Sequence, residues 1–550
     1  MVLAHTFDVR LRRQPQTNIT TIIMRGELSV MRHALPIGLC SLALLLPTSI
    51  VLASAGSEAI DRHCSACHQT QSGPQSWSRI SAQRKTPEGW DMTIARMQTM
   101  HGLELPLEAR RDIVKFLADT RGLAPEESAP QRELIERRLN RIESFDHPSY
   151  QEMCARCHTG GRAQLQRRPL EEWESLVHFH VGQFQTIEYQ AMARDRDWFD
   201  LALNEIAPWL AETQHLENDA WEAWQQAELT SPEGDWQLWG HWPGEGDFYA
   251  DVTINAAEGE DAYSLSLDGA FTSGRPLSGE GQAIVYTGYE WRASLNLNGR
   301  DLKQVLDLSG AQPSGRIFDD HDEAFGMMVE MVPHEAAEPA VLASLPASLK
   351  AGERSRLVLL GSGLGEGEIN LGEGVTVRNV VERSDMRLVL DVEASTDLTP
   401  GWLPMQIGEI SAERLLAGYR TVDRLEVSPA LGVARIGNDK TPPVSGVFTA
   451  AGYLDGADEA IPLGQVPVRW SVSPWDEIAE RDEDARFAGI LDAATGIFSP
   501  AGAGPNPLRQ YNANSVGNLR VTASVVGQEA MQDEAQLIVT VQRWNNPPLR

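Results

Sequence analysis

The spacing of apolar residues divides the chain into a helical N-terminal part and a longer, strand-rich part. Residues 106–120 and 198–210 place apolar side chains three and four positions apart, a spacing that predicts amphipathic helices. Gly122, just past the first stretch, is typical of the position that follows a helix. From about Pro232 the helical spacing fades, and short apolar runs alternate with Gly, Asn, Asp and Pro. This change predicts an all-α region followed by all-β domains.

The strand-rich part divides into three regions, each of which we expect to be a separate β domain. Residues 232–335 are predicted to form an antiparallel β-barrel or sandwich, and residues 336–429 and 430–550 two sandwiches of immunoglobulin type. The helical region before them covers residues 56–231. The strands that the alternation predicts are 248–255, 263–267, 282–287, 355–361, 375–381, 387–392, 466–472, 519–526 and 536–542.

The N-terminus has the features of an export signal. A short basic segment at residues 31–33 precedes an apolar stretch over residues 34–53, and an A-x-A cleavage pattern ends at Ala55. We interpret residues 1–55 as a presequence and signal peptide, with Met31 as a candidate start. A membrane anchor is the alternative, and the prolines inside the apolar stretch argue against it. No later stretch reaches the ~18 apolar residues of a spanning helix, so we expect a soluble, exported protein in a bacterial periplasm.

Length and charge narrow the class of protein further. The chain has 550 residues, too many for one ordinary domain, and its 42% hydrophobic content is that of a globular protein. Its 47 Lys and Arg against 77 Asp and Glu give a formal net charge of −30. Without residues 1–55 the balance is 42 basic against 75 acidic residues, or −33. So acidic a surface repels phosphate backbones, which excludes nucleic acid as a partner.

Two cysteine motifs carry the candidate chemistry. After removal of Cys40 with the signal peptide, four cysteines remain, in two C-x-x-C-H motifs. This pattern is typical of covalent attachment of c-type haem, because the two thiols reach the porphyrin vinyl groups and the histidine lies under the iron. The first motif is Cys64, Cys67 and His68, and the second is Cys154, Cys157 and His158.

Three other interpretations of the cysteines are weaker. A zinc site built from two Cys-x-x-Cys pairs leaves both trailing histidines unexplained. A thioredoxin-like dithiol expects a neighbouring βαβ pattern, which the sequence lacks. Two disulfides would likewise give no role to the histidines. We therefore expect two haems c and no disulfide in the mature chain.

An internal repeat indicates the sixth ligand of each iron. A tryptophan follows each motif, at Trp90 and Trp173, and begins a helical stretch. Seven positions after each tryptophan stand Met97 and His180. A thioether and an imidazole are the usual distal ligands of electron-transfer haems, so we predict His68/Met97 for one haem and His158/His180 for the other. Both tryptophans are interpreted as core or haem-packing residues rather than redox relays.

Other side chains compete for these positions. Met100 and His101 lie close to Met97, and His101 shares its helix face. His178 and Met192 are the alternatives to His180. Met97 could also be a core methionine beside the porphyrin.

The chain resembles the α subunit of quinohemoprotein amine dehydrogenase along essentially its whole mature length. The resemblance is carried by both haem motifs, by Ala95-Arg96-Met97, His101-Gly102, Glu188-Tyr189-Gln190-Ala191 and Arg194-Asp195-Arg196-Asp197-Trp198, and by Ala434-Arg435-Ile436-Gly437, Phe487-Ala488-Gly489 and Gly504-Pro505-Asn506-Pro507.

The resemblance implies a subunit of a periplasmic αβγ heterotrimer that oxidises primary amines. The family's cysteine tryptophylquinone lies on a small partner subunit, and a β-propeller subunit completes the active site. The α subunit then passes electrons through two haems, one His/Met and one bis-His, to a soluble copper protein or cytochrome c. This chain has no spare cysteine for such a quinone, so we expect no catalytic residue here. A stand-alone dihaem peroxidase and a free dihaem carrier are the alternatives.

Overall fold

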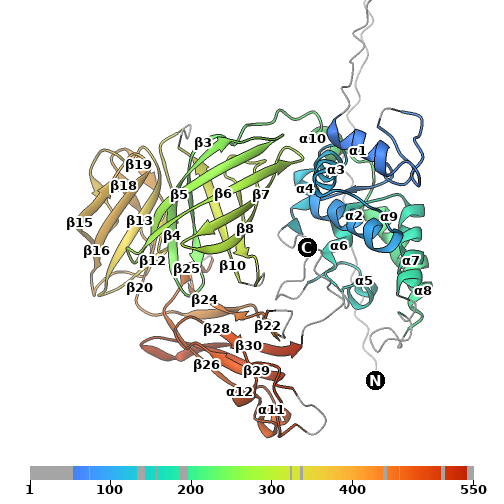
Figure 1. The fold of residues 1–550 in the computed structure, drawn as a ribbon. Coiled ribbons are helices and arrows are strands. Elements are labelled where there is room, and N and C mark those ends of the chain that lie inside the picture. Colours follow the sequence, from blue (N-terminus) through green and yellow to red (C-terminus); the bar gives the residue numbers. More distant parts are fainter. Residues whose placement is uncertain are drawn as a thin grey trace, which may run out of the picture. The chain divides into compact units, whose positions relative to one another are not determined.

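The computed structural model describes residues 54–541, apart from gaps at 74, 133–142, 156–157, 185–186, 188–195, 323–324, 335–337, 438–441, 457–458 and 510–513. Most of the predicted signal peptide (residues 1–53), Cys157, Met192 and the resemblance segments within 188–195 lie outside the described residues. The described residues belong to one compact unit. Figure 1 shows the helical part in blue to teal and the strands in green to red. Among the described helices, none combines the length and apolarity needed to cross a membrane.

The core of the helical region contains the two repeat tryptophans, Trp90 and Trp173. The predicted helix over residues 106–120 is confirmed as α3, whose buried face includes Ile113 and Leu117. This face packs with Trp90 in one core cluster, while Trp173 lies in a second cluster with Tyr150. The helices are α1 (Ala55–His63), α2 (Pro87–His101), α3 (Leu107–Thr120), α4 (Pro125–Ser128), α5 (Pro148–Met153), α6 (Gly161–Gln164), α7 (Leu170–Gln183), α8 (Trp198–Leu201), α9 (Ala207–Thr213) and α10 (Asp219–Trp224).

The second predicted helix, over residues 198–210, is helical throughout but not regular. It consists of α8, a π-helical turn η3 (Ala202–Ile206) and α9. Pro208 has no N–H to donate to the carbonyl four residues earlier, and the wider turn directly precedes it. The apolar face is kept despite this irregularity, since Ala202, Ile206 and Leu210 are buried.

The first β region forms a closed antiparallel barrel of eight strands within the described residues. Consecutive strands pair in order, and β10 closes the barrel on β3 through the partners Val329 and Gly240. Alternate side chains point inward and fill the interior, among them Phe248 and Trp291. The strands are β3 (Gly234–Trp242), β4 (Gly246–Ala256), β5 (Ala262–Phe271), β6 (Pro276–Tyr286), β7 (Glu290–Leu297), β8 (Arg300–Asp307), β9 (Ser314–Asp319) and β10 (Gly326–Pro333).

The next region pairs its strands into three small sheets, in the orders β11-β13-β16-β15, β12-β20-β17 and β14-β18-β19. Leu357, Leu359, Leu388 and Leu390 form the centre of its core. Its strands are β11 (Ala340–Leu345), β12 (Ser348–Lys350), β13 (Arg354–Ser362), β14 (Ile369–Asn370), β15 (Val375–Arg383), β16 (Arg387–Ala394), β17 (Gly401–Trp402), β18 (Met405–Ile407), β19 (Ile410–Ala412) and β20 (Ala417–Tyr419).

The last region has a similar plan, with sheets β21-β24-β25, β22-β30-β29-β26 and β23-β28-β27. Its core includes Phe448, Trp470 and Phe498. Its elements are β21 (Arg424–Ser428), β22 (Leu431–Ile436), β23 (Gly446–Val447), β24 (Thr449–Leu454), β25 (Ile461–Gln465), β26 (Val468–Pro474), α11 (Glu477–Arg481), α12 (Asp484–Phe487), β27 (Gly489–Leu491), β28 (Ile497–Pro500), β29 (Gly517–Val525) and β30 (Gln528–Val541).

The turn between β6 and β7 ties the barrel to the helical region. The backbone N–H of Thr287 donates to Oδ1 of Asp119 over 2.8 Å, and its hydroxyl donates to the carbonyl of Ala118 over 2.9 Å. A Cβ on Gly122 would lie 2.2 Å from that Ala118 carbonyl and 2.6 Å from the Thr287 hydroxyl. Gly122 therefore follows α3 because no side chain fits between the helix and the turn.

A buried charge cluster lies beside this turn. Arg292 of β7 binds Glu88 of α2 through Nε at 2.6 Å and Nη2 at 3.2 Å. The same guanidinium lies 3.2 Å from Glu290, whose side chain is fully buried. Burial raises the pKa of Glu290 to about 7; the charge of Arg292 opposes the rise, and the charge of Glu88 adds to it. The cluster links the barrel to the helix that carries Met97.

Candidate haem sites

The two repeat units of the helical region meet at a short pairing of equivalent residues. β1 (Arg84–Lys85) pairs antiparallel with β2 (Gln166–Arg167), and Arg84 faces Arg167. These arginines are 83 positions apart, the same separation as Trp90 from Trp173 and Met97 from His180. When equivalent residues of two repeats face each other in an antiparallel pair, a local two-fold axis passes between them. The contact between the two repeats is thus locally two-fold symmetric at this pair.

The sequence contains a signal for this pairing that the tryptophan count missed. Gln83-Arg84-Lys85 and Gln166-Arg167-Arg168 are nearly identical and precede the two tryptophans at equal distance. Two residues are too few for a strand to be predicted from alternation. The similarity of the two tripeptides, together with their spacing, was the available signal.

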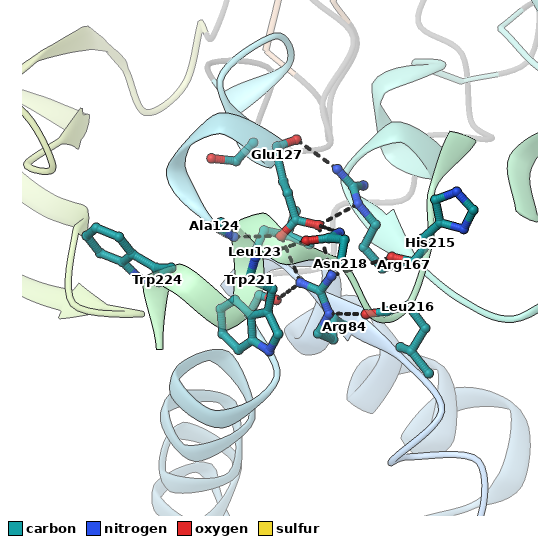
Figure 2. A network of polar contacts seen from close by, with 12 residues as sticks. Arg84, Leu123, Ala124, Glu127, Arg167, His215, Leu216, Asn218, Trp221 and Trp224 are labelled. Atoms are coloured by element: carbon teal, nitrogen blue, oxygen red, sulfur yellow. Dashed lines mark hydrogen bonds and ion pairs between the residues drawn. The ribbon is translucent and has the colours of Figure 1, made fainter. Parts of the chain in front are cut away.

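Both paired arginines bind one carboxylate, that of Glu127 in α4 (Figure 2). Arg84 donates through Nη1 to Oε2 and through Nη2 to Oε1, each over 2.8 Å. Arg167 donates through Nε to Oε1 over 2.8 Å, and the Asn218 side chain reaches the same oxygen at 2.7 Å. The backbone N–H of Ala124 donates to Oε2 over 2.7 Å. The residues of this group, which we call the Glu127 node, hold the two units together.

The Glu127 node is buried and strongly polarised. The Arg84, Arg167 and Glu127 side chains are 3%, 7% and 5% exposed. Burial alone would raise the pKa of Glu127, but the hydrogen bonds and charges of Arg84 and Arg167 outweigh it and lower the pKa to about 2. Burial lowers the pKa of Arg167, and the Glu127 charge opposes that fall. The carboxylate is therefore ionised at any physiological pH.

The first motif follows α1 in a tight turn. The Cys64 N–H donates to the carbonyl of Ile60 over 2.8 Å, and the His68 N–H donates to the carbonyl of Cys64 over 2.9 Å. The imidazole Nδ1 of His68 lies 2.9 Å from the carbonyl of Ser78, which leaves Nε2 available to a metal ion. Burial, and then the neighbouring Cys67, raise the pKa of the Cys64 thiol to about 11. The turn thus places a thiol and an oriented imidazole together, as haem attachment requires.

The distal candidates of this unit differ in exposure. Met97 is half-buried on α2, whereas Met100 is 48% exposed and His101 is exposed. Among the described residues, Met97 is not a member of the apolar core cluster around Trp90. Gly102 ends the helix in the left-handed conformation, with φ of 68° and its N–H on the Met97 carbonyl. The pairing of Met97 with His68 stays a prediction.

The second motif repeats the geometry of the first. The Cys154 N–H donates to the carbonyl of Tyr150 over 2.9 Å, as Cys64 does to Ile60. The Nδ1 atom of His158 lies 2.7 Å from the carbonyl of Thr159, and that of His180 lies 2.7 Å from the carbonyl of Leu176. The rings of His158 and His180 are 6.5 Å apart between centres and 35° apart in plane.

The spacing of this histidine pair fits one metal ion between the two rings. A metal–imidazole bond is about 2 Å long, so two imidazoles on opposite sides of one ion hold their centres roughly 6 Å apart. Both rings have Nδ1 on a carbonyl, which leaves Nε2 for a metal. The buried Trp173 Nε1–H has no hydrogen-bond partner among the described residues, whereas Trp90 Nε1 donates to the carbonyl of Arg121. A bound group carrying acceptor oxygens would satisfy that donor.

His178, the described competitor of His180, has different neighbours. His178 is exposed and its ring contacts Phe199, with centres 5.2 Å apart. His180 instead contacts Trp198, with ring centres 5.9 Å apart. Burial lowers the pKa of His180, the hydrogen bond to the Leu176 carbonyl opposes this, and the charges of Arg96, Arg162 and Arg168 lower it further. The ligand assignments for both units stay predictions.

Four family models match successive parts of the chain, and each describes a part of one kind of subunit. The model for quinohemoprotein amine dehydrogenase A, alpha subunit, haem binding, matches residues 54–221. The models for domains II, III and IV of the quinohemoprotein amine dehydrogenase alpha subunit match residues 230–333, 338–420 and 425–549. No curated protein matches the chain.

Several solved structures match parts of the chain. A redesigned β-barrel covers 19% of this chain and 91% of its own, at 14% identity and a TM-score of 0.17. Cadherin domains 1–4 of protocadherin gamma B7 cover 46% of this chain and 57% of their own, at 12% identity and 0.15. Domains 5–6 of the S-layer protein SbsC cover 37% and 99%, at 10% identity and 0.16. At these TM-scores the likenesses carry no argument about function.

Proposed function

Because the chain belongs to the family of quinohemoprotein amine dehydrogenase α subunits, with a haem-binding domain followed by domains II, III and IV, we propose that it is a dihaem electron carrier. In this proposal it takes electrons from a tryptophylquinone on a small partner subunit during oxidative deamination of primary amines. It delivers them to a soluble acceptor, a copper protein or a cytochrome c. The amine chemistry itself takes place on the partner, since this chain has no cysteine outside the two motifs and the presequence.

The observation that carries the proposal is the His158–His180 pair, whose ring centres are 6.5 Å apart. Cys154 and Cys157 would attach this haem, and Cys64 and Cys67 the other, with His68 and Met97 as its axial ligands. The two-fold relation supports Met97, because it stands 83 positions before His180 and the Arg84–Arg167 pair has the same offset. A bound haem supplies reversible one-electron redox chemistry at its iron.

The two ligand sets give the transfer a direction. A methionine ligand raises the reduction potential relative to a second histidine, other factors being equal. Met97 thus makes the first unit the stronger oxidant, and His180 makes the second the stronger reductant. Electrons are expected to enter at the unit of His158 and leave from the unit of His68.

The remaining features extend this proposal. We assign residues 1–55 to an export signal for the periplasm, residues 56–231 to the dihaem domain with units 56–145 and 146–231, and residues 232–335, 336–429 and 430–550 to the three β domains. The last two are proposed to be immunoglobulin-like. The partners are proposed to be a β-propeller subunit and the small quinone-bearing subunit.

Purification of the intact complex tests the proposal. The pyridine haemochrome spectrum should give two haems c per chain, and a small quinone-bearing subunit should copurify. The reduced haems should not bind carbon monoxide, because both irons are six-coordinate. A chain that purifies alone overturns the dehydrogenase assignment and favours a free carrier. Carbon monoxide binding to one haem favours the peroxidase.

A further inference from the structure

The residues that precede the two distal ligand candidates contact each other. Arg96 precedes Met97 on α2, and Phe179 precedes His180 on α7. Arg96 and Phe179 are 83 positions apart, so they are equivalent residues of the two units, like Arg84 and Arg167. The Arg96 Cζ atom lies 5.9 Å from the centre of the Phe179 ring. The two-fold relation therefore brings the distal-ligand helices together at this pair.

The Arg96 side chain is held in place by its own helix. Its Nη2 donates to the hydroxyl of Thr93 over 3.1 Å. That hydroxyl donates in turn to the carbonyl of Gly89 over 2.8 Å and accepts from Nζ of Lys85 over 2.7 Å. A guanidinium fixed within about 6 Å of an aromatic face is stabilised by the ring quadrupole. Arg96 is thus a positioned cation rather than a freely rotating surface charge.

A continuous line of contacts runs from the Arg96 guanidinium to the His158–His180 pair. The rings of Phe179 and His180 meet edge to face, with centres 6.2 Å apart. His180 then faces His158 at 6.5 Å. The positive charge of Arg96 belongs to the first unit, yet it lies one aromatic ring away from a ligand candidate of the second.

We propose that Arg96, held against Phe179, raises the reduction potential of the haem bound by His158 and His180 through its positive charge. The inference rests on the dihaem function proposed above. Reduction adds one electron to the iron and breaks or forms no bond, so a fixed positive charge nearby favours the reduced form. One electron leaves the reduced iron of the second unit and enters the oxidised iron of the first. Arg96 narrows the potential difference between them and keeps that transfer close to reversible.

Spectroelectrochemical titration of the holo complex tests the proposal, with each haem followed through its own low-spin signature. In Arg96→Gln we expect the oxidised-to-reduced ratio of the bis-His haem, at a fixed potential, to rise at least threefold. This change corresponds to about 30 mV, at 59 mV per tenfold for one electron. The His/Met haem should shift less. Arg96→Lys should restore most of the potential, because it keeps the charge.

Arg111→Gln is the matched control, since Arg111 is an exposed cation of the same domain. Arg111→Gln should shift both potentials by less than Arg96→Gln shifts that of the bis-His haem, and its effect should vanish at high salt. Equal shifts of both haems in Arg96→Gln, no shift, or an equal effect of Arg111→Gln would overturn the inference. If Arg96→Gln does not assemble, Phe179→Leu carries the test, and an unchanged potential of the bis-His haem in that variant overturns the inference. The proposed function fails separately, if the wild-type complex lacks two haems or a bis-His signature.

Discussion

Arg84 and Arg167 face each other across a two-residue antiparallel pair and bind the same carboxylate, although 83 residues separate them. Each belongs to a different repeat unit, and the carboxylate of Glu127 comes from α4, toward the end of the first unit. The burial of all three groups makes the attraction strong and its loss costly.

Replacement of Glu127 by Gln should destabilise the helical domain by about 3–5 kcal/mol at pH 7, because it leaves two buried guanidinium groups without a counter-charge. The folded pKa of about 2 lies below the usual carboxyl value of 4.5. The stabilisation is therefore present above pH 4.5 and is lost as the pH falls toward 2. Denaturant unfolding from pH 7 to pH 3 measures it, and the difference in stability between the two proteins should shrink below pH 4.5. Glu126→Gln, at the exposed neighbour, should have little effect at either pH.

Replacement of Glu290 by Gln should change the pH dependence of stability in the opposite direction. The folded pKa of about 7 lies above the usual 4.5, so the wild-type protein binds an extra proton between these values. Its stability relative to Glu290→Gln should fall as the pH rises from 4.5 to 7, by up to about 3 kcal/mol, and then stay level. Urea unfolding at pH 5 and pH 8 checks the sign. Glu330→Gln, at an exposed site on the same barrel, should show no such slope.

Replacement of Met97 by His should lower one reduction potential and leave the other nearly unchanged, because imidazole replaces thioether on a single iron. A redox titration followed by absorbance resolves the two haems. Met100→His is the control, since Met100 is exposed on the same helix. If Met97→His moves neither potential, Met97 is not the ligand.

Replacement of Gly122 by Ala should weaken the attachment of the barrel to the helical domain by about 1–3 kcal/mol, because the new methyl group meets a backbone carbonyl at 2.2 Å. Thermal unfolding should show a lower midpoint. Gly182→Ala is the matched control on α7, where no atom lies within 4 Å of the added Cβ. That substitution should leave stability unchanged or raise it slightly. Equal loss in both variants would contradict the packing argument at Gly122.

Local patterns in the sequence predicted the helices and strands well. The alternation over residues 248–255 and 519–526 corresponds to β4 and β29, and the apolar spacing over residues 106–120 corresponds to α3. Alternation says which face of a strand is buried but not which strand lies beside it. The closure of β10 on β3 and the parallel pairing of β22 with β30 were therefore out of reach.

The sequence predicted only those features of the candidate sites that depend on the spacing of residues along the chain. The cysteine motifs and the seven-residue count from Trp90 and Trp173 select residues by position along the chain. The contacts of Glu127 with Arg84 and Arg167 span 43 and 40 residues, and a lone glutamate in an acidic chain gives no sign of two arginine partners. The contact between Arg96 and Phe179 could not be predicted either, because the two equivalent positions carry different residue types and so show no repeat in the sequence.

The sharing of Glu127 means that the duplicated domain is not a string of two modules. A segment cut after residue 145 would keep Arg84 and Glu127 but lose Arg167 and Asn218, while the remaining segment would keep a buried arginine with no acid. Exchange of either half for a unit from another protein is therefore expected to need a replacement for this contact. Through the shared carboxylate of Glu127, the second unit depends on the first for the neutralisation of its buried arginine.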